Sequence, residues 1–269
     1  MDLGLAGATA VVVGGSRGMG RAAARCFAED GARVAVLARS RSHLDEVVDD
    51  LMRRGSPEVI GLRADATDAG QLDAAFSEVG QRWGGELNIL VNAVGPDVRG
   101  GFEELGDEQW QQAVELGAMS MVRCVRTALP LLRRADWARI VNFSATSTKR
   151  QGVSLVAYTA AKSMVASISK NLSQSLAADE ILVNVISPGS VATEGLVGWA
   201  KTVGVCAPDG EVDPYRLMEV VTEHFGHPAH LPRAGLPEEI GPVVAFLASR
   251  RNSYMTGANV NVDGGTDFS

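Results

Sequence analysis

The sequence predicts an α/β protein with a doubly wound parallel sheet of about seven strands and helices on both faces. Two observations lead to this fold class. Short apolar runs rich in β-branched residues alternate with longer amphipathic stretches along the whole chain. The runs are continuously apolar, which is typical of strands buried on both faces of a helix-covered parallel sheet.

The expected elements follow one another in β-α order, which predicts right-handed crossovers and a Rossmann-type sheet. The expected strands are residues 9–14, 33–38, 58–63, 88–93, 138–144, 181–187 and 259–264. The expected helices are residues 19–30, 41–54, 69–83, 107–134, 157–178 and 237–249. No low-complexity tract, short repeat or linker interrupts this pattern, so residues 1–269 are expected to form a single domain.

Residues 189–236, between the sixth strand and the last helix, show no regular pattern and are rich in glycine and proline. A long irregular segment in a compact domain is usually functional. Because it follows the carboxyl end of a strand, where ligands bind in such sheets, we expect it to cover the substrate. Its apolar side chains indicate a hydrophobic substrate or, alternatively, a loop docked on the core. These side chains are Leu196, Val197, Trp199, Val203, Val205, Met218, Val221 and Phe225.

The composition argues against several functional classes. The net charge is −7 and no basic block occurs, so nucleic acid is not an expected partner. No apolar run reaches the roughly 18 residues of a membrane span. The three cysteines lack C-x-x-C spacing, and the N-terminus lacks the features of a signal peptide. We therefore expect a cytoplasmic protein that acts on a small molecule.

Three histidines, His224, His227 and His230, form an H-x-x-H-x-x-H pattern. The residues between them, Phe-Gly and Pro-Ala, break any regular helix, and no acid or cysteine completes a ligand set. We interpret them as loop histidines and expect no metal.

A glycine-rich turn joins the first expected strand to the first helix. Gly14, Gly18 and Gly20 give the pattern G-x-x-x-G-x-G, with Ser16, Arg17 and Met19 between them. Glycines at this place let the backbone approach a pyrophosphate at the positive end of the helix. A plain tight turn is the alternative, but the position between strand and helix favours a dinucleotide site.

The end of the second strand predicts which dinucleotide binds. An acid there would bind the ribose 2′-hydroxyl of NAD, whereas an arginine accommodates the 2′-phosphate of NADP. The strand ends in Ala38-Arg39-Ser40, and Arg17 lies in the glycine turn. Two arginines can hold a phosphate through charge-assisted hydrogen bonds, although both could instead be solvated surface residues. We expect NADP(H), with Arg17, Arg39 and Ser40 in its site.

Tyr158 and Lys162 are four residues apart on an expected helix and therefore share one face. A tyrosine titrates near 10, so at neutral pH it is a poor acid-base group unless a nearby ammonium lowers its pKa. An ordinary exposed pair is the alternative interpretation. The surrounding motifs favour a catalytic pair.

With these motifs in order, the chain resembles the short-chain dehydrogenase/reductases over essentially its whole length. The resemblance rests on the glycine turn 14–20, Asp65 in "RADATD", "NAVG" at 92–95, Tyr158-x-x-x-Lys162, "SPGSVATE" at 187–194 and "TGANVNVDGG" at 256–265.

The resemblance implies roles for individual positions. Tyr158 would donate a proton to a carbonyl oxygen while NADPH delivers hydride, and Lys162 would bind the nicotinamide ribose and tune Tyr158. The implied cofactor contacts are Asp65 and Ala66 at the adenine, Asn92, Ala93 and Gly95 at a strand end, and Pro188, Gly189, Val191 and Thr193 at the nicotinamide amide. Relatives usually have a second asparagine where Ala93 stands. They also form homodimers or homotetramers, which we expect here.

Two positions depart from the family pattern. The substrate-binding serine would fall on Ala145, so Ser144 is the candidate replacement, with Thr146 and Ser147 as further candidates. The helix asparagine falls on Gly117. Glycine there either preserves the helix irregularity of relatives or marks the loss of their proton relay.

The sequence thus predicts an NADPH-dependent oxidoreductase that reduces a ketone, or oxidises the alcohol, of a medium-sized, largely apolar substrate. Two alternatives stay open. One is reduction of an enoyl or dienoyl thioester. The other is a cofactor-binding protein with a degraded active site.

Overall fold

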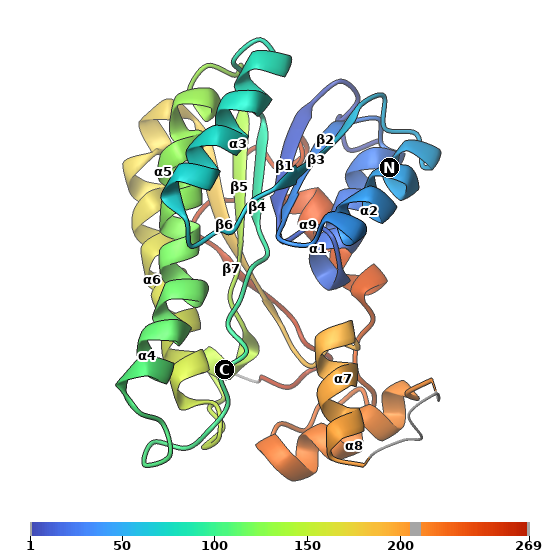
Figure 1. Cartoon of the computed structure of the whole chain (residues 1–269), viewed down its shortest axis with the longest axis vertical. Coiled ribbons are helices and arrows are strands. Elements are labelled where there is room, and N and C mark those ends of the chain that lie inside the picture. Colours follow the sequence, from blue (N-terminus) through green and yellow to red (C-terminus); the bar gives the residue numbers. More distant parts are fainter. Residues whose placement is uncertain (1, 205–210, 268–269) are drawn as a thin grey trace.

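The computed structural model describes residues 2–204 and 211–267. Within them lies one sheet with the strand order β3-β2-β1-β4-β5-β6-β7, and every neighbouring pair is parallel (Figure 1). The strands are β1 Thr9–Val13, β2 Arg33–Ala38, β3 Val59–Arg63, β4 Ile89–Asn92, β5 Ala138–Phe143, β6 Ile181–Pro188 and β7 Asn259–Val262. The order reverses between β1 and β4, which is where ligands bind in such sheets. The predicted fold class is confirmed.

Helices cover both faces of the sheet. In Figure 1, α1, α2 and α9 lie on one side, and α3, α5 and α6 lie on the other. The helices are α1 Gly18–Glu29, α2 Arg41–Arg53, α3 Ala69–Arg82, α4 Asp107–Val114, α5 Ser120–Leu132, α6 Val156–Ser175, α7 Glu194–Thr202, α8 Pro214–Phe225 and α9 Pro237–Leu247. A π-helical turn, η1 (Glu115–Met119), joins α4 to α5.

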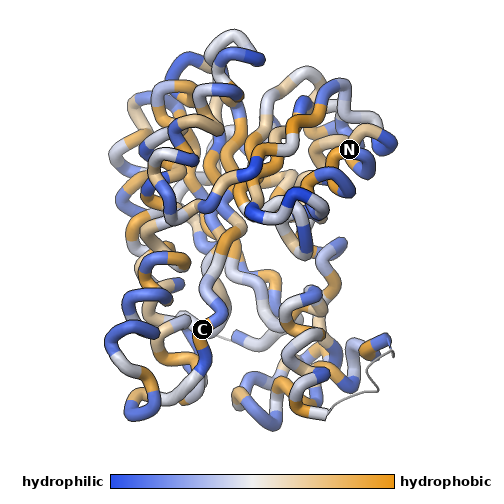
Figure 2. The backbone as a smooth tube through the Cα atoms, viewed as in Figure 1, coloured by the Kyte–Doolittle hydropathy of each residue, from blue (hydrophilic) through white to orange (hydrophobic). Residues whose placement is uncertain are grey.

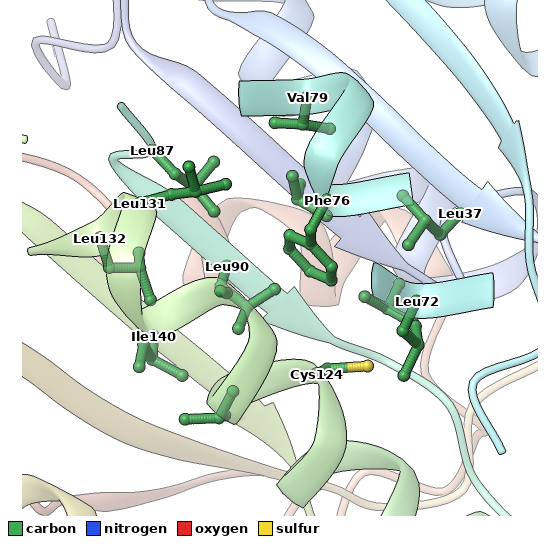
Figure 3. Packing of buried hydrophobic residues seen from close by; sticks show 14 of the residues in the cluster. Leu37, Leu72, Phe76, Val79, Leu87, Leu90, Cys124, Leu131, Leu132 and Ile140 are labelled. Atoms are coloured by element: carbon green, nitrogen blue, oxygen red, sulfur yellow. The ribbon is translucent and has the colours of Figure 1, made fainter. Parts of the chain in front are cut away.

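Two apolar clusters, one on each face, hold the helices to the sheet. Figure 3 shows the cluster beneath α3 and α5, where Phe76 and Leu72 of α3 pack beside Leu90 of β4. The other cluster includes Phe27 of α1 and Val244 of α9. Apolar residues accordingly concentrate along the central strands in Figure 2. Burial of this surface is the main force that fixes the sheet and the strand ends carrying the site.

The segment 189–236 was expected to be irregular, and this prediction was wrong for a large part of it. Helices α7 and α8 form there, beyond the carboxyl ends of the strands (Figure 1). Thr193 caps α7, and Asp213 caps α8 with Pro214 in the first turn. Such caps satisfy the N–H groups that a helix start leaves without partners. Residues 205–210, which include Val205, lie outside the described residues.

No helix in the part of the chain that the structure describes is long and apolar enough to cross a membrane.

Candidate active site

The glycine turn between β1 and α1 has the shape of a dinucleotide cradle. Gly14 and Gly18 have φ angles of 78° and 52°, in the left-handed region where a side chain is strained. A Cβ at Gly20 would lie 2.4 Å from the Gly14 carbonyl oxygen, so no other residue fits. The first turn of α1 carries no acidic residue. Its N–H groups and positive dipole end are therefore available to an anion.

The ends of β1, β4 and α6 meet beside this turn. The Ala93 N–H donates to Val13 O at 2.9 Å, and Asn92 Nδ2 donates to Asn142 Oδ1 at 2.8 Å. A Cβ at Gly95 would lie 3.1 Å from Lys162 Nζ. The segment 92–95 therefore supports the site through its backbone and through an amide pair, and its small residues leave room for a ligand and for the lysine.

Two arginines lie where the 2′ group of the adenosine is expected. Arg17 precedes α1, Arg39 follows β2, and both side chains are exposed. Neither forms an ion pair with a residue that the structure describes. Ser40 caps α2, its Oγ accepting from the His43 N–H at 3.4 Å. The Asp65 carboxylate accepts from Thr67 at 2.8 and 2.9 Å and so shapes the turn that buries Ala66.

Tyr158 and Lys162 both lie on α6, as the spacing predicted, and both line one cavity. Lys162 is buried, and its Nζ donates to Phe143 O at 2.8 Å and Val94 O at 3.2 Å. Burial lowers the pKa of Lys162 to about 8. Two main-chain carbonyls therefore fix the position of the ammonium group at the ends of β4 and β5.

Lys162 does not lower the pKa of Tyr158, contrary to expectation. Burial raises the pKa of Tyr158 to about 12, and the smaller lowering influence comes from Arg99. The predicted lowering by Lys162 was therefore wrong, because removal from water disfavours the phenolate and the ammonium is engaged by carbonyl oxygens. At neutral pH Tyr158 is a protonated phenol, the form that can donate a proton.

The structure distinguishes among the hydroxyls that could replace the missing serine. Ser144 Oγ donates its one proton to Lys162 O at 2.9 Å, so its hydroxyl anchors α6. Thr146 Oγ1 donates to Pro188 O at 3.1 Å. Ser147 Oγ accepts from Thr159 Oγ1 at 3.1 Å, which leaves its own proton available. All three line the cavity, together with the methyl group of Ala145. The geometry therefore disfavours Ser144 as a substrate donor and favours Ser147.

Close packing against α6 explains why glycine occupies position 117. It lies in η1, where the Ser120 N–H donates to Glu115 O, one residue farther back than in an α-helix. A Cβ at Gly117 would lie 2.7 Å from Ala161 Cβ and 3.3 Å from Pro96 Cδ. The helix irregularity that relatives have at this position is therefore present here. Glycine allows the close approach of α6, next to Lys162.

The segment after β6 meets the glycine turn from the other side. A Cβ at Gly18 would lie 3.2 Å from Thr193 Cγ2, and one at Gly189 would lie 2.8 Å from Asp263 Cα. Val191 is buried, and the following Ala192 N–H donates to Gly235 O at 2.8 Å. These contacts bring Pro188–Thr193 to the crevice beside the glycine turn, where the resemblance expects them.

A cavity of about 390 Å³ joins these parts. Its walls come from the glycine turn, the ends of β4, β5 and β6, helix α6, and the segment carrying α7 and α8. The predicted site residues among them are Met19, Ala93, Gly95, Ser144, Tyr158, Lys162, Pro188, Gly189, Val191 and Thr193. Gly14, Ser16, Arg17, Gly18, Gly20, Arg39, Ser40, Asp65, Ala66 and Asn92 are not part of its wall.

Sequence reasoning missed Arg99 and underestimated His227, which both line the cavity. Arg99 pairs with Asp97 at 2.9 Å, and its guanidinium lies 5.2 Å from the centre of the Trp199 ring. The position of Arg99 shortly after "NAVG" (92–95) was the signal available in the sequence. Nothing in the pattern distinguished His227 from its two neighbours.

The side chains of His224, His227 and His230 lie in three different environments. The His224 ring packs edge-on against Trp199, and its Nδ1 lies 3.0 Å from Val220 O. His227 lines the cavity. The His230 ring lies beside Gly265. Within the described residues, no cluster of histidine, cysteine and acidic side chains could hold a metal ion.

Known proteins resemble this chain in sequence over almost its whole length. A family model described as Enoyl-(Acyl carrier protein) reductase matches residues 13–267. A tropinone reductase homolog of Arabidopsis thaliana is 31% identical, over 97% of this chain and 92% of that protein. A 3-oxoacyl-[acyl-carrier-protein] reductase of Staphylococcus aureus is 27% identical, over 96% of this chain and 97% of that protein.

Solved structures are also similar to this fold. L-sorbose reductase from Gluconobacter frateurii, complexed with NADPH and L-sorbose, superimposes with a TM-score of 0.90 at 30% identity. The match covers 99% of this chain and 98% of that one. With the glycine cradle and the Tyr158–Lys162 pair in place, the chain belongs to the short-chain dehydrogenase/reductase family and is an NAD(P)-dependent oxidoreductase.

Proposed function

We propose that this protein is an NADP(H)-dependent reductase of a ketone of medium size and largely apolar character, and that it oxidises the corresponding alcohol in reverse. One observation carries the proposal. Tyr158, Lys162 and the segment Pro188–Thr193 line the same cavity as apolar side chains from the substrate-covering segment. Those side chains are Leu196, Val221 and Phe225.

The residues present fit NADP(H). The glycine turn packs too tightly for a side chain at Gly20, and Gly14 and Gly18 have positive φ angles, so the main chain is bare at the N-terminus of α1. Arg17 and Arg39, exposed and without acidic partners in the described chain, suit a 2′-phosphate. NADPH, when bound, supplies a hydride to the substrate carbonyl carbon.

The protein's own residues would bind and protonate the carbonyl oxygen of the substrate. Tyr158 donates its phenolic proton to the carbonyl oxygen, and its raised pKa keeps it protonated at neutral pH. Lys162, fixed by Phe143 O and Val94 O, places a positive charge beside the reacting groups. Ser147, whose hydroxyl proton has no acceptor among the described residues, would donate the second hydrogen bond to the oxygen.

Reduction of an acyl thioester is the second candidate. The matching family model is described as an enoyl reductase, and one relative is a 3-oxoacyl reductase. Both descriptions concern substrates carried on acyl carrier protein. The apolar wall formed by Leu196, Val221 and Phe225 would also accept an acyl chain.

The test is a comparison of substrates with the purified full-length protein. NADPH and NADH consumption is measured with apolar ketones, 3-oxoacyl thioesters and enoyl thioesters. Turnover of the ketones with NADPH supports the proposal, and preferential turnover of enoyl thioesters would replace it with the second candidate. NADPH binding without any turnover would refute both and support a degraded active site.

We also propose a homodimer or homotetramer in the cytoplasm, by likeness to the family. In the described chain, β7 is an edge strand of the sheet, with Tyr254 and Met255 exposed beside it. Such an edge is a natural place for pairing between copies. Native mass spectrometry of the full-length protein tests the assembly, and a monomer would refute it.

A further inference from the structure

Arg99 is a charged side chain in the cavity wall that the proposed mechanism does not use. It forms an ion pair with Asp97, in which Arg99 Nη2 lies 2.9 Å from Asp97 Oδ1. The Arg99 side chain is 30% exposed, so solvent and ligands can reach it. No further acceptor for its N–H groups occurs among the described residues. Because a guanidinium has five N–H donors, Arg99 can still bind a ligand.

The main chain on both sides of Arg99 is fixed against the cavity. Val98 is buried in one apolar cluster with Ala157 of α6. The Gly100 N–H donates to Ser154 O at 2.8 Å, just before α6 begins. Arg99 therefore starts from a defined position beside the helix that lines the cavity, and its side chain is not a solvated surface arginine.

An aromatic ring orients the guanidinium. Arg99 Cζ lies over the ring of Trp199 of α7, 5.2 Å from its centre. The Trp199 ring in turn packs against Phe225 of α8, with 4.7 Å between the ring centres. A guanidinium over an aromatic face is attracted by the ring, and its N–H groups point outward in its own plane. That planar fork matches the two oxygens of a carboxylate.

The charges of the cavity wall also favour an anionic group. Among the described residues, its charged side chains are Arg99, Lys162 and Asp97. Lys162 donates to two main-chain carbonyls, so Arg99 is the cation with donors to spare. Burial has the largest effect on the pKa of Tyr158, and smaller effects come from Arg99, which lowers it, and Asp97, which raises it. Both charges therefore lie near enough to act on the phenol.

Asp97 indicates which group Arg99 accepts and does not exclude a substrate. Its side chain is 77% exposed, and an ion pair with so exposed a partner contributes little to stability. A substrate carboxylate can therefore replace the Asp97 carboxylate on Arg99. An ammonium group would be repelled by Arg99 and would gain only the exposed Asp97.

We propose that Arg99 binds a carboxylate group of the substrate, so that the preferred substrates are oxo acids, apolar ketones that carry a carboxylate several bonds from the carbonyl group. This inference rests on the proposed ketone reduction and narrows it. Tyr158 and Ser147 act on the carbonyl oxygen, while Arg99 binds the acid end and determines specificity.

The experiment compares each oxo acid with its primary amide, which has nearly the same shape and no charge. Suitable acids are 4-oxopentanoate, 5-oxohexanoate and 4-oxo-4-phenylbutanoate, each assayed with NADPH and the full-length protein. We expect wild type to favour at least one acid over its amide by about tenfold or more in kcat/KM, since hydrogen bonds between charged partners are the strong ones. Oxoalkyl phosphonates of the same lengths test whether another anion is preferred.

Four variants locate the origin of that preference. Arg99→Met keeps an unbranched side chain without charge and should bring the ratio of acid to amide close to one. Arg99→Lys keeps the charge without the planar fork and should retain part of the ratio. Asp97→Asn removes the competing carboxylate and should raise the ratio. Arg216→Met is the matched control, because Arg216 is 52% exposed on α8 outside the cavity wall, and it should match wild type.

The outcomes separate this inference from the proposed function. Equal losses on acid and amide in Arg99→Met would indicate that Arg99 only holds α7, and would overturn the inference. A wild-type enzyme that reduces amides as well as acids, or phosphonates better than acids, would overturn it without any variant. If wild type reduces no ketone of any kind, the proposed function fails, and the inference fails with it.

Discussion

Replacing Gly117 by alanine tests how closely α6 must approach η1. The added Cβ would lie 2.7 Å from Ala161 Cβ. Two carbon atoms make a favourable contact at about 3.5–4.0 Å, so the helices must separate by roughly 1 Å. Because Ala161 directly precedes Lys162, this movement displaces the ammonium group from Phe143 O and Val94 O.

Two opposing free-energy changes determine the stability of Gly117→Ala. Overpacking in a core costs about 1–3 kcal/mol. The change from glycine to alanine in a helix returns roughly 0.5–1 kcal/mol. We therefore expect Gly117→Ala to lower the free energy of unfolding by about 1–2 kcal/mol. A displacement of about 1 Å at the lysine should lower kcat/KM by about 10- to 100-fold.

Urea unfolding and steady-state kinetics measure both effects. The control is the double variant Gly117→Ala/Ala161→Gly, which removes the opposing methyl group and should recover much of the lost kcat/KM. A single variant that is more stable than wild type, with unchanged kcat/KM, would refute the close-packing account of Gly117.

Three further predictions concern charge and hydroxyl groups. Burial lowers the pKa of Lys162 from its usual 10.5 to about 8, so the native state binds fewer protons and stability rises with pH between about 8 and 10.5. Lys162→Met should remove this rise, worth at most roughly 3 kcal/mol in urea unfolding, and a rise of the same size in the variant would contradict the assignment. Arg17→Ala and Arg39→Ala should each weaken NADPH binding about tenfold or more and leave NADH binding nearly unchanged, as measured by calorimetry; equal losses for both cofactors would argue against a 2′-phosphate contact. Ser147→Ala should lower kcat by about 10- to 1000-fold, whereas Ser144→Ala should mainly lower the thermal midpoint, and the reverse pattern would restore Ser144 as the substrate donor.

The sheet could be predicted because most strands, such as β1 and β2, are nearly continuous apolar runs whose pattern itself indicates burial. Residues 33–38, for example, form β2 with the predicted bounds. Helices α7 and α8 were missed because frequent glycine and proline residues in segment 189–236 obscured the helical pattern. The N-cap Asp213 followed by Pro214 at the first helical position was the missed signal, and the buried face of Leu217, Met218 and Val221 agrees with a helix.

The site was predictable at positions where backbone geometry demands one residue type. Gly14 and Gly20 are such positions. The i, i+4 spacing of Tyr158 and Lys162 correctly predicted that both lie on one helix, α6. The contacts of the hydroxyl groups were not predictable, because they depend on which acceptor lies within reach after folding. Ser144 turns to Lys162 O, a contact between residues 18 positions apart that no local pattern encodes.

The measurement that tests the central claim most directly is ketone-dependent NADPH consumption by Tyr158→Phe. The substitution removes only the hydroxyl group, and Tyr254→Phe is the matched control because Tyr254 is fully exposed at 97%. We expect Tyr158→Phe to lose about 10²- to 10⁴-fold in kcat with NADPH affinity retained, since a positioned general acid contributes that much. The control should match wild type. A Tyr158→Phe enzyme that reduces the ketone at the wild-type rate would contradict the account.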